Sequence, residues 1–315
     1  MSLASDNLTA LIYLRNQVRK WKNLAFIILI ISLLLLSRSF FAPASNVEEG
    51  INIGGDYIAN ITIEGIILDD NYRENVLRKI ADQKNIKAVI VNINSPGGGI
   101  VGSEVLYERL REISAKKPIV VSMGSLAASG GYMAAIASDY IIARNGTLTG
   151  SIGVLMQSSE ITDLAKKLGI KLVTYKSSVL KGSPSPFEKS NPEIDKVINE
   201  SIKDSYKFFA DLVLERRKNK IKKSDIKNII DGRVFTGRQA LKAGLIDEIG
   251  GRKEALNYLK NNYNINTDKL EIRDLSIEEP EKKFFEKIFG TESIIRKSIM
   301  NIFSLFPEKH LMAIW

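Results

Sequence analysis

The chain contains no cysteine and only one histidine among its 315 residues. The absence of cysteine excludes disulfide bonds, thiolate zinc sites, iron–sulfur clusters and a cysteine nucleophile. The histidine, His310, lies near the C-terminal end, so a site with several histidine ligands is excluded, and a Ser-His-Asp triad would need the tail to fold back. We therefore expect no metal and no other cofactor, and a nucleophile would need a base other than histidine.

Signs of nucleic-acid or nucleotide binding are also scarce. The phosphate-loop pattern G-x-x-x-x-G-K-[ST] is missing. The net charge of +9 lies partly near the N-terminus and partly in six cations at residues 216–223, and no aromatic side chain interrupts that run to stack on bases. We interpret the run as the solvated end of an amphipathic helix, although an anionic partner is the alternative. We expect no nucleic-acid partner.

One long apolar stretch suggests a membrane anchor. Residues 24–37 carry no charge, and residues 24–42 reach the length of a span if Arg38 extends its charge to the far interface. Four cations precede the stretch, and after Arg38 the next cation is Arg73. By the positive-inside rule the N-terminus is cytoplasmic and the chain after residue 42 lies outside the inner membrane. A signal peptide cleaved near Ala42-Pro43-Ala44 is the alternative.

The rest of the chain predicts a domain of alternating strands and helices. With an apolar content of 44%, the chain has the composition of a globular protein. The alternation predicts an α/β fold whose strands are mostly parallel and covered by helices. The expected strands are residues 57–63, 66–68, 87–94, 118–123, 139–143, 152–156 and 171–175, and the expected helices are residues 71–83, 102–113, 129–137 and 192–217.

The resulting division of the chain has five parts. A cytoplasmic segment (1–23), the anchor (24–42) and a polar linker (43–56) precede the main domain (57–265). The strand signal fades from Lys269, and the apolar spacing after Phe284 fits an amphipathic helix, so we expect a helical tail over 266–315. Its role is open, since it would fit a subunit or membrane contact as well as packing on its own domain.

Two glycine-rich turns are the places to look for a site, because ligands of parallel sheets bind where strands end and helices begin. In the first, residues 95–99 (SPGGG), successive glycines would let backbone N–H groups approach a phosphate or an oxyanion. A plain tight turn is the alternative. The second, residues 124–132 (GSLAASGGY), places Ser129 among small residues at the expected start of a helix. There it would be either a nucleophile or an ordinary N-cap serine.

A serine nucleophile in this chain would need a lysine base. A lysine can accept a proton once burial and the absence of a carboxylate lower its pKa. Residues 175–187 contain no acid, and they include Lys176 and Lys181. Lys181 lies between apolar residues and Gly182. The pattern is compatible with a lysine base but does not indicate whether Lys176 or Lys181 is that base.

Four blocks of the sequence, in this order and spacing, resemble the signal peptide peptidase A family of protease IV-like serine–lysine peptidases in its short, single-domain form. The blocks are SPGGG (95–99), MGSLAASGGY (123–132), TGSIGV (149–154) and KGSPSP (181–186). The resemblance covers residues 57–260 and implies the fold shared by Clp proteases and crotonases. One departure is Gly182, where the family often has an acid.

The resemblance also implies roles for individual residues. Ser129 would be the nucleophile, Lys181 the general base and Ser151 the serine that orients the lysine, while the N–H groups of Gly98 and Gly130 would form the oxyanion hole. It implies cleavage of hydrophobic peptides, notably remnant signal peptides, without ATP or metal. It also implies a homo-oligomer in which the lysine can come from a neighbouring subunit.

Two other functions remain open at this level. A crotonase-like acyl-CoA enzyme would use the same glycine N–H groups to hold a thioester enolate, although Ser129 and the expected exported location disfavour it. A membrane scaffold without catalysis could have the same fold, and only the presence of both Ser129 and Lys181 speaks against it.

Overall fold

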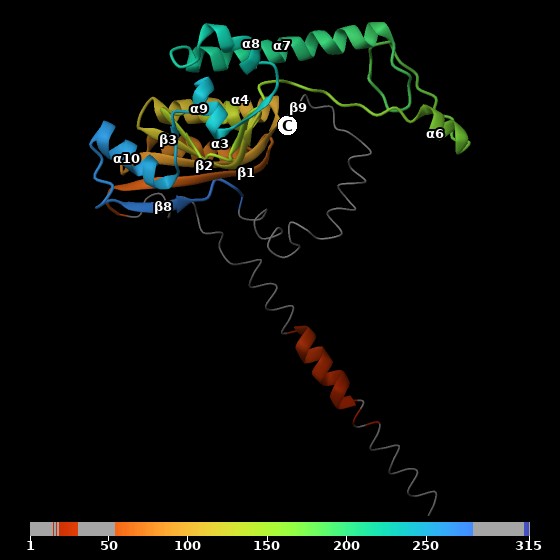
Figure 1. The fold of residues 1–315 in the computed structure, drawn as a ribbon. Coiled ribbons are helices and arrows are strands. Elements are labelled where there is room, and N and C mark those ends of the chain that lie inside the picture. The colour runs from red at the N-terminus through yellow and green to blue at the C-terminus, as the bar shows by residue number, and fades with distance from the viewer. Residues whose placement is uncertain (1–14, 16, 18, 31–53, 280–311, 315) are drawn as a thin grey trace, which may run out of the picture. The chain divides into compact units, whose positions relative to one another are not determined.

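The computed structural model describes residues 15, 17, 19–30, 54–279 and 312–314, in two units that divide after Asn46 (Figure 1). In the first unit, residues 19–30 are helical. The expected membrane span begins within this helix, and its remainder, residues 31–42, lies outside the described residues. Over the part of the chain that is described, no helix has the length and apolar character needed to cross a bilayer.

The second unit is built on one sheet of mostly parallel strands, which confirms the predicted α/β class. The strands are β1 (Tyr57–Ile67), β2 (Ile86–Gly99), β3 (Ile119–Ala128), β4 (Tyr140–Ala143), β5 (Leu148–Gly150), β6 (Val234–Thr236), β7 (Glu248–Ile249), β8 (Glu271–Leu275) and β9 (Met312–Ile314). The main order is β6-β5-β3-β2-β1-β8, and only the β5–β6 and β2–β9 pairings are antiparallel. β3 changes partner along its length, pairing β4 through residues 120–122 and β5 through residues 126–128.

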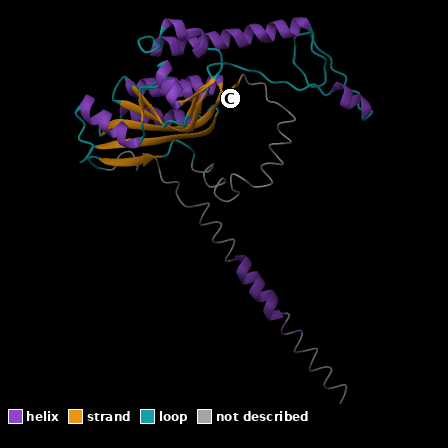
Figure 2. Ribbon diagram, viewed as in Figure 1, coloured by secondary structure: helices purple, strands orange, loops and turns teal. Residues whose placement is uncertain are grey.

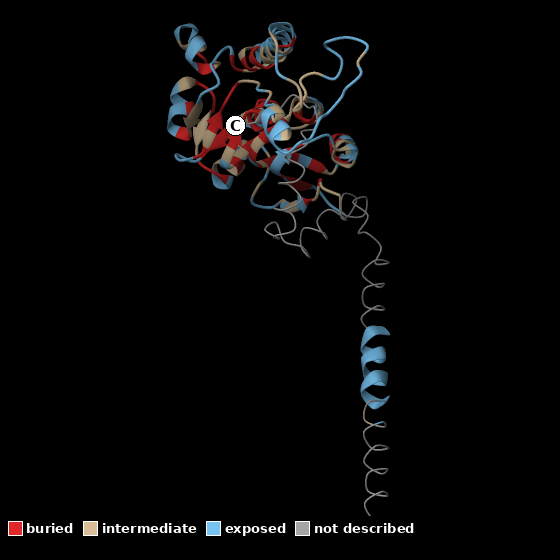
Figure 3. Cartoon of the chain, turned by 90° about the vertical axis from the view of Figure 1, so that its right-hand side faces the viewer, coloured by how far each residue is buried: buried red, intermediate tan, exposed pale blue. Residues whose placement is uncertain are grey.

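Helices cover both faces of this sheet (Figure 2). They are α3 (Asn71–Asp82), α4 (Ile100–Ser114), α5 (Gly130–Ala135), α6 (Thr162–Lys167), α7 (Pro192–Arg217), α8 (Ile226–Ile229), α9 (Gly237–Ala243) and α10 (Arg252–Tyr263), with a 3-10 turn at Lys223–Asp225. Alternate residues of the central strands point to opposite faces. Ile61, Val91 and Val121 belong to the core shared with α3 and α4, whereas Ile58 and Ile90 pack with α10. Figure 3 shows the buried residues gathered between these layers.

Most of the predicted elements are confirmed, and the differences have physical causes. The strands expected at 57–63 and 66–68 are one strand, β1, with a register shift between Glu64 and Ile66. The strands expected at 152–156 and 171–175 are wrong, because these residues lie in irregular chain, with only an isolated bridge at Leu155. The expected helical tail is wrong at 271–275, which form β8 beside β1. It is also wrong at Met312–Ile314, which form β9, while the apolar positions at 284–299 lie outside the described residues.

A segment between the sheet and α7 leaves the body of the domain. We call residues 155–191 the arm; it includes α6 and extends beyond the sheet, and α7 returns from it (Figure 1). Large apolar side chains of the arm are exposed, namely Leu155, Leu164, Leu168, Ile170, Leu172, Val173, Tyr175, Val179 and Leu180. The arm therefore presents apolar side chains that the described part of the chain leaves exposed.

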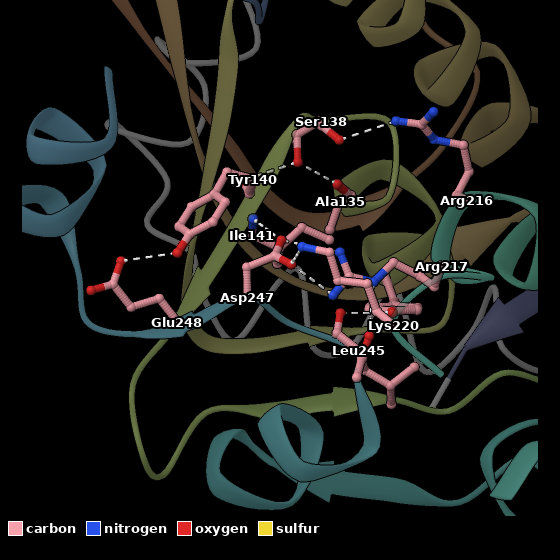
Figure 4. Close-up of polar contacts among 12 residues, drawn as sticks. Ala135, Ser138, Tyr140, Ile141, Arg216, Arg217, Lys220, Leu245, Asp247 and Glu248 are labelled. Carbon is pink, nitrogen blue, oxygen red and sulfur yellow. Dashed lines mark hydrogen bonds and ion pairs between the residues drawn. The ribbon is translucent and has the colours of Figure 1, made fainter. Parts of the chain in front are cut away.

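A buried ionic cluster fastens the C-terminal end of α7 to the body (Figure 4). The Arg217 guanidinium donates two hydrogen bonds of 3.0 Å to the Asp247 carboxylate, whose side chain is only 1% exposed. Asp247 also accepts from Lys220 and from the backbone N–H of Ile141. Beside it, Arg216 donates to the carbonyls of Ile136 and Ser138, directly after α5. The cluster therefore ties α7 to the helix that follows the second glycine turn.

Removal of Arg217 should destabilise the domain. In Arg217→Ala the buried Asp247 carboxylate loses its main partner, and breaking such a pair costs about 3–5 kcal/mol. Denaturant unfolding should show this as a lower free energy of unfolding. The matched control on the same helix is Lys207→Ala, whose ion pair with Asp211 is exposed, and it should change little. Equal, small losses in both variants would contradict the assigned role.

The same cluster predicts a dependence of stability on pH. Burial alone would raise the pKa of Asp247, but the hydrogen bonds and charge of Arg217 and the contacts with Lys220 and Ile141 outweigh it and lower the pKa. A carboxyl whose pKa is lowered by folding stabilises the fold above its unfolded pKa of about 3.9, and this contribution is lost as the pH falls through the folded value. The stability difference between wild type and Arg217→Ala should therefore shrink progressively as the pH falls below about 4.

Candidate active site

The first glycine turn is the continuation of β2 rather than a free loop. Gly97 has a φ of 104°, and its N–H donates to the Ser95 hydroxyl at 3.0 Å. Gly98 lies opposite Ile67 of β1, and a Cβ on Gly98 would overlap the carbonyl oxygen of Ile67. Any larger residue would push this part of β2 away from β1. The backbone of residues 97–99 is therefore held by packing against β1 and by the Ser95 hydroxyl.

The glycines of this turn also match a dinucleotide-binding pattern. Residues 97–102 read GGGIVG, which fits G-x-G-x-x-G between a strand and a helix. The structure gives the last glycine a packing role. A Cβ on Gly102 would lie 2.6 Å from the carbonyl carbon of Leu68, so α4 can pack closely against the end of β1 only with glycine there. Close backbone approach therefore explains Gly98 and Gly102, and the positive φ explains Gly97.

Ser129 occupies the junction between β3 and α5 in a backbone conformation that is unusual for serine. Its φ is 53° and its ψ is −120°, and its N–H donates to the carbonyl of Gly150 at 2.8 Å. The residue is fully buried, and its hydroxyl oxygen has no hydrogen-bond partner in the described chain. Its side chain makes no capping hydrogen bond, so the N-cap alternative does not account for it. An unpaired buried hydroxyl on a strained backbone is typical of a functional site.

The second glycine turn packs directly on the first. A Cβ on Gly130 would overlap the Ser103 hydroxyl and would lie 3.3 Å from the Cα of Gly97. A Cβ on Gly131 would lie 2.9 Å from the carbonyl oxygen of Ser95. The two turns, which are separate in the sequence, therefore meet beside Ser129.

Ser151 lies at the neighbouring strand end. Gly150 pairs with Ala128 in the β3–β5 ladder, so Ser129 and Ser151 are the residues that follow two adjacent strands. Ser151 has a φ of 51°, is 7% exposed, and donates its N–H to the carbonyl of Arg233 at 2.8 Å. Among the described residues only Ser129, Ser151 and Asn264 are non-glycine residues with positive φ. Two of these three strained positions are therefore predicted site serines.

The structure does not bring Lys181 to Ser129 within one chain. Lys181 lies on the arm and is exposed, while the Ser129 hydroxyl has no partner. Lys176, the other lysine of the acid-free stretch, is paired with Glu188 and also donates to Ser183. Of the two lysines that the sequence left open, Lys176 is therefore engaged, and Lys181 has no side-chain partner in the described chain.

Two buried serines that the sequence analysis did not single out hold the first turn. Ser95 accepts from the N–H of Gly97, and Ser103 donates to the carbonyl of Gly99 at 2.9 Å. Both side chains are fully buried. The sequence did carry a signal, because a serine lies on each side of three consecutive glycines. Ser95 precedes the glycines, and Ser103 follows them in the first turn of α4.

The comparisons with known proteins identify the family of this chain. Residues 111–266 match the profile of peptidase family S49. A candidate protease of Synechocystis sp. is 34% identical over 247 residues, which is 78% of this chain and 87% of that protein. A candidate signal peptide peptidase SppA of Enterococcus faecium is 34% identical over 241 residues, 71% of this chain and 70% of that protein. The fold and these relatives thus define a serine peptidase of α/β type.

The chain belongs to peptidase family S49. Among solved structures, a membrane-bound stomatin-specific protease in complex with a substrate peptide matches with a TM-score of 0.46 and 18% identity, over 75% of this chain and 99% of that one. The ClpP1 protease of Listeria monocytogenes matches with a TM-score of 0.42 and 15% identity, over 62% of this chain and 92% of that one. The family assignment leaves the acyl-CoA enzyme and the inert scaffold without support.

Substitution of Gly98 tests the geometry of the first turn. Gly98→Ala should push this part of β2 away from Ile67 of β1. If Gly98 is an oxyanion donor, as the family resemblance implies, its loss should lower kcat about 10²–10³-fold. The matched control is Gly99→Ala, because a Cβ on Gly99 meets nothing within 4 Å. Peptide hydrolysis and thermal unfolding should be measured for both variants. An active Gly98→Ala protein with unchanged stability would show that the turn is not held as described.

Proposed function

We propose that this peptidase is a membrane-anchored endopeptidase that cleaves hydrophobic peptides, such as remnant signal peptides after export, with a dyad of Ser129 and Lys181. The observation that carries the proposal is the buried, unpaired hydroxyl of Ser129, held at positive φ beside the backbone of two glycine turns. To act as a nucleophile, a hydroxyl in this position needs a base that accepts its proton. The enzyme named signal peptide peptidase among the relatives supports the substrate class.

In this mechanism the Ser129 oxygen attacks the carbonyl carbon of the scissile peptide bond. Neutral Lys181 takes the hydroxyl proton and later gives it to the leaving amine. The N–H groups of Gly98 and Gly130 stabilise the negative oxygen of the tetrahedral intermediate. Ser151, at the strand end next to Ser129, orients the lysine amine by a hydrogen bond. Water then hydrolyses the acyl-enzyme ester, which releases the acyl product and regenerates the Ser129 hydroxyl.

We further propose that Lys181 reaches the Ser129 of a neighbouring subunit. Neither group has a side-chain partner in the described part of its own chain, and Lys181 lies on the arm, outside the body that holds Ser129. The arm exposes many large apolar side chains, and exposed apolar surface of this kind favours contact with another protein surface. A homo-oligomer that buries the arm would also desolvate the lysine, which favours the neutral amine.

The proposal also includes a membrane anchor in the N-terminal part of the chain. Residues 24–42 would span the inner membrane with the N-terminus in the cytoplasm, because four cations precede the stretch. The catalytic domain would then lie on the extracytoplasmic side. There it would meet apolar peptides left in the bilayer after export.

Mixing two inactive variants tests the shared dyad. Ser129→Ala and Lys181→Ala should each lower peptide hydrolysis by at least about a thousandfold. If the dyad forms between subunits, mixed oligomers regain activity in about a quarter of their sites by random assortment. No recovery after verified subunit exchange would contradict a dyad formed between chains. Lys176→Ala is the matched control from the same arm, and it should remain active because its amine is engaged by Glu188.

Removal of the anchor separates membrane attachment from chemistry. A variant lacking residues 1–44 should leave the membrane fraction and still hydrolyse a short apolar peptide, since the described site draws no residue from that segment. Membrane fractionation and peptide hydrolysis measure the two effects. Continued sedimentation of the shortened protein with washed membranes would place the attachment elsewhere in the chain.

A further inference from the structure

We propose that Tyr132 is a positioning residue for the reaction, because its phenol hydroxyl fixes the orientation of α5, the helix that begins directly after Ser129. The inference rests on the proposed function, in which Ser129 is the nucleophile and the N–H of Gly130 stabilises the oxyanion. Tyr132 acts in this role through α5 and not by contact with the reacting atoms.

The helix α5 is too short to hold its own position. It has six residues, all of them buried, and an isolated helix of that length is unstable in water. The N–H of Met133 donates to the carbonyl of Ser129 at 2.9 Å, so the backbone of Ser129 belongs to the first turn. A rotation of α5 about its axis therefore moves the Ser129 carbonyl and the Gly130 N–H together.

The composition of α5 leaves one side chain that can set this rotation. The helix reads GGYMAA, so only Tyr132 carries a side-chain hydrogen-bond donor. Close contacts of Gly130 and Gly131 with the first glycine turn set how near the helix approaches. Burial of its apolar side chains has no preferred direction, whereas a hydrogen bond requires that donor and acceptor are aligned.

The Tyr132 hydroxyl makes a long-range hydrogen bond inside the domain. It donates to the carbonyl oxygen of Leu245 at 2.8 Å, across 113 positions of sequence, and both residues are fully buried. Burial raises the pKa of Tyr132, so the phenol keeps its proton and remains a donor. The bond therefore ties α5 to the segment that follows α9 at every pH near neutrality.

The acceptor of this bond lies in a firmly held part of the domain. Gly244, which precedes Leu245, has a φ of 77°, and its carbonyl accepts from the Arg217 side chain at 2.9 Å. Figure 4 shows Leu245 beside Arg217 of the ionic cluster around Asp247. Tyr132 thus connects the helix next to the nucleophile with the cluster that fastens α7.

Replacement of Tyr132 by phenylalanine removes the hydroxyl and keeps the ring. In Tyr132→Phe, kcat for an apolar peptide should fall about ten- to a hundredfold with unchanged KM, because a misplacement of about 1 Å can cost a hundredfold in rate. Labelling of Ser129 by a small fluorophosphonate should slow by the same factor. The midpoint of the pH profile of kcat should stay where it is, since Tyr132 exchanges no proton with the site.

The matched control is Tyr206→Phe on α7. The Tyr206 hydroxyl also donates to a backbone carbonyl, that of Ile230, at 2.7 Å. Both variants lose one such bond and should unfold at a lower temperature than wild type, but only Tyr132→Phe should lose kcat. Wild-type kcat in both variants would overturn the inference, and so would a shifted pH profile in Tyr132→Phe.

Two further variants keep the test decisive. Incorporation of p-aminophenylalanine at position 132 retains a donor at the same place and should restore most of kcat. If Tyr132→Phe does not fold, Arg216→Gln loosens α5 from its other end, because Arg216 donates to the carbonyls of Ile136 and Ser138. It should lower kcat at unchanged KM, and wild-type kcat in this variant would then overturn the inference.

Ser129→Ala separates this inference from the proposed function. Hydrolysis that survives in Ser129→Ala overturns the proposed function. Loss of hydrolysis in Ser129→Ala together with wild-type kcat in Tyr132→Phe overturns only the positioning role of Tyr132.

Discussion

The hydrogen bond from the N–H of Ser129 to the carbonyl of Gly150 joins the ends of β3 and β5 and fixes the point from which the site is built. It holds Ser129 at a φ of 53°, which serine rarely adopts, and so keeps the side chain out of the ordinary N-cap position. A strained residue persists only where its surroundings determine it. Here the surroundings are a strand ladder on one side and two glycine turns in close contact on the other.

In the proposed mechanism the active site has two halves that lie apart within one chain. The proposed nucleophile Ser129, with Ser151, Gly98 and Gly130, lies in the body of the domain. The half with Lys181 lies on the exposed arm, and the cluster around Asp247 fixes the far end of the helix that returns from the arm. Under this proposal, the described part of one chain leaves the Ser129 hydroxyl without a hydrogen-bond partner and Lys181 without a side-chain partner. Assembly of chains would complete both at once and cover the apolar surface of the arm.

Most helices and strands of the fold could be predicted from the sequence, because they depend on residues that are close together in the chain. The helix expected at 192–217 has those bounds in the structure, since the Asn191 side chain accepts the N–H groups of Glu193 and Ile194 and Pro192 fits the first turn. The strand expected at 171–175 failed for the opposite reason. Its residues favour a strand, but strand propensity takes effect only beside a partner, and this part of the arm has none in its own chain.

For the site as well, the features that depend on neighbouring residues could be predicted from the sequence, and those that depend on distant contacts could not. The sequence could select Ser129 as a candidate but could not separate a nucleophile from an N-cap, because backbone dihedrals decide between them. It could not separate Lys176 from Lys181, since Glu188 lies just beyond the acid-free stretch. The pairing of β9 with the first glycine turn joins residues at opposite ends of the domain, and no local pattern announces it.

An experimental structure of the assembled protein measures the central quantity directly, which is the distance from the Ser129 hydroxyl oxygen to the nearest Lys181 amine of another subunit. The account predicts a distance of about 2.6–3.2 Å, within reach of proton transfer. An assembly in which every such pair of atoms, within and between chains, is separated by more than a single bridging water would contradict it.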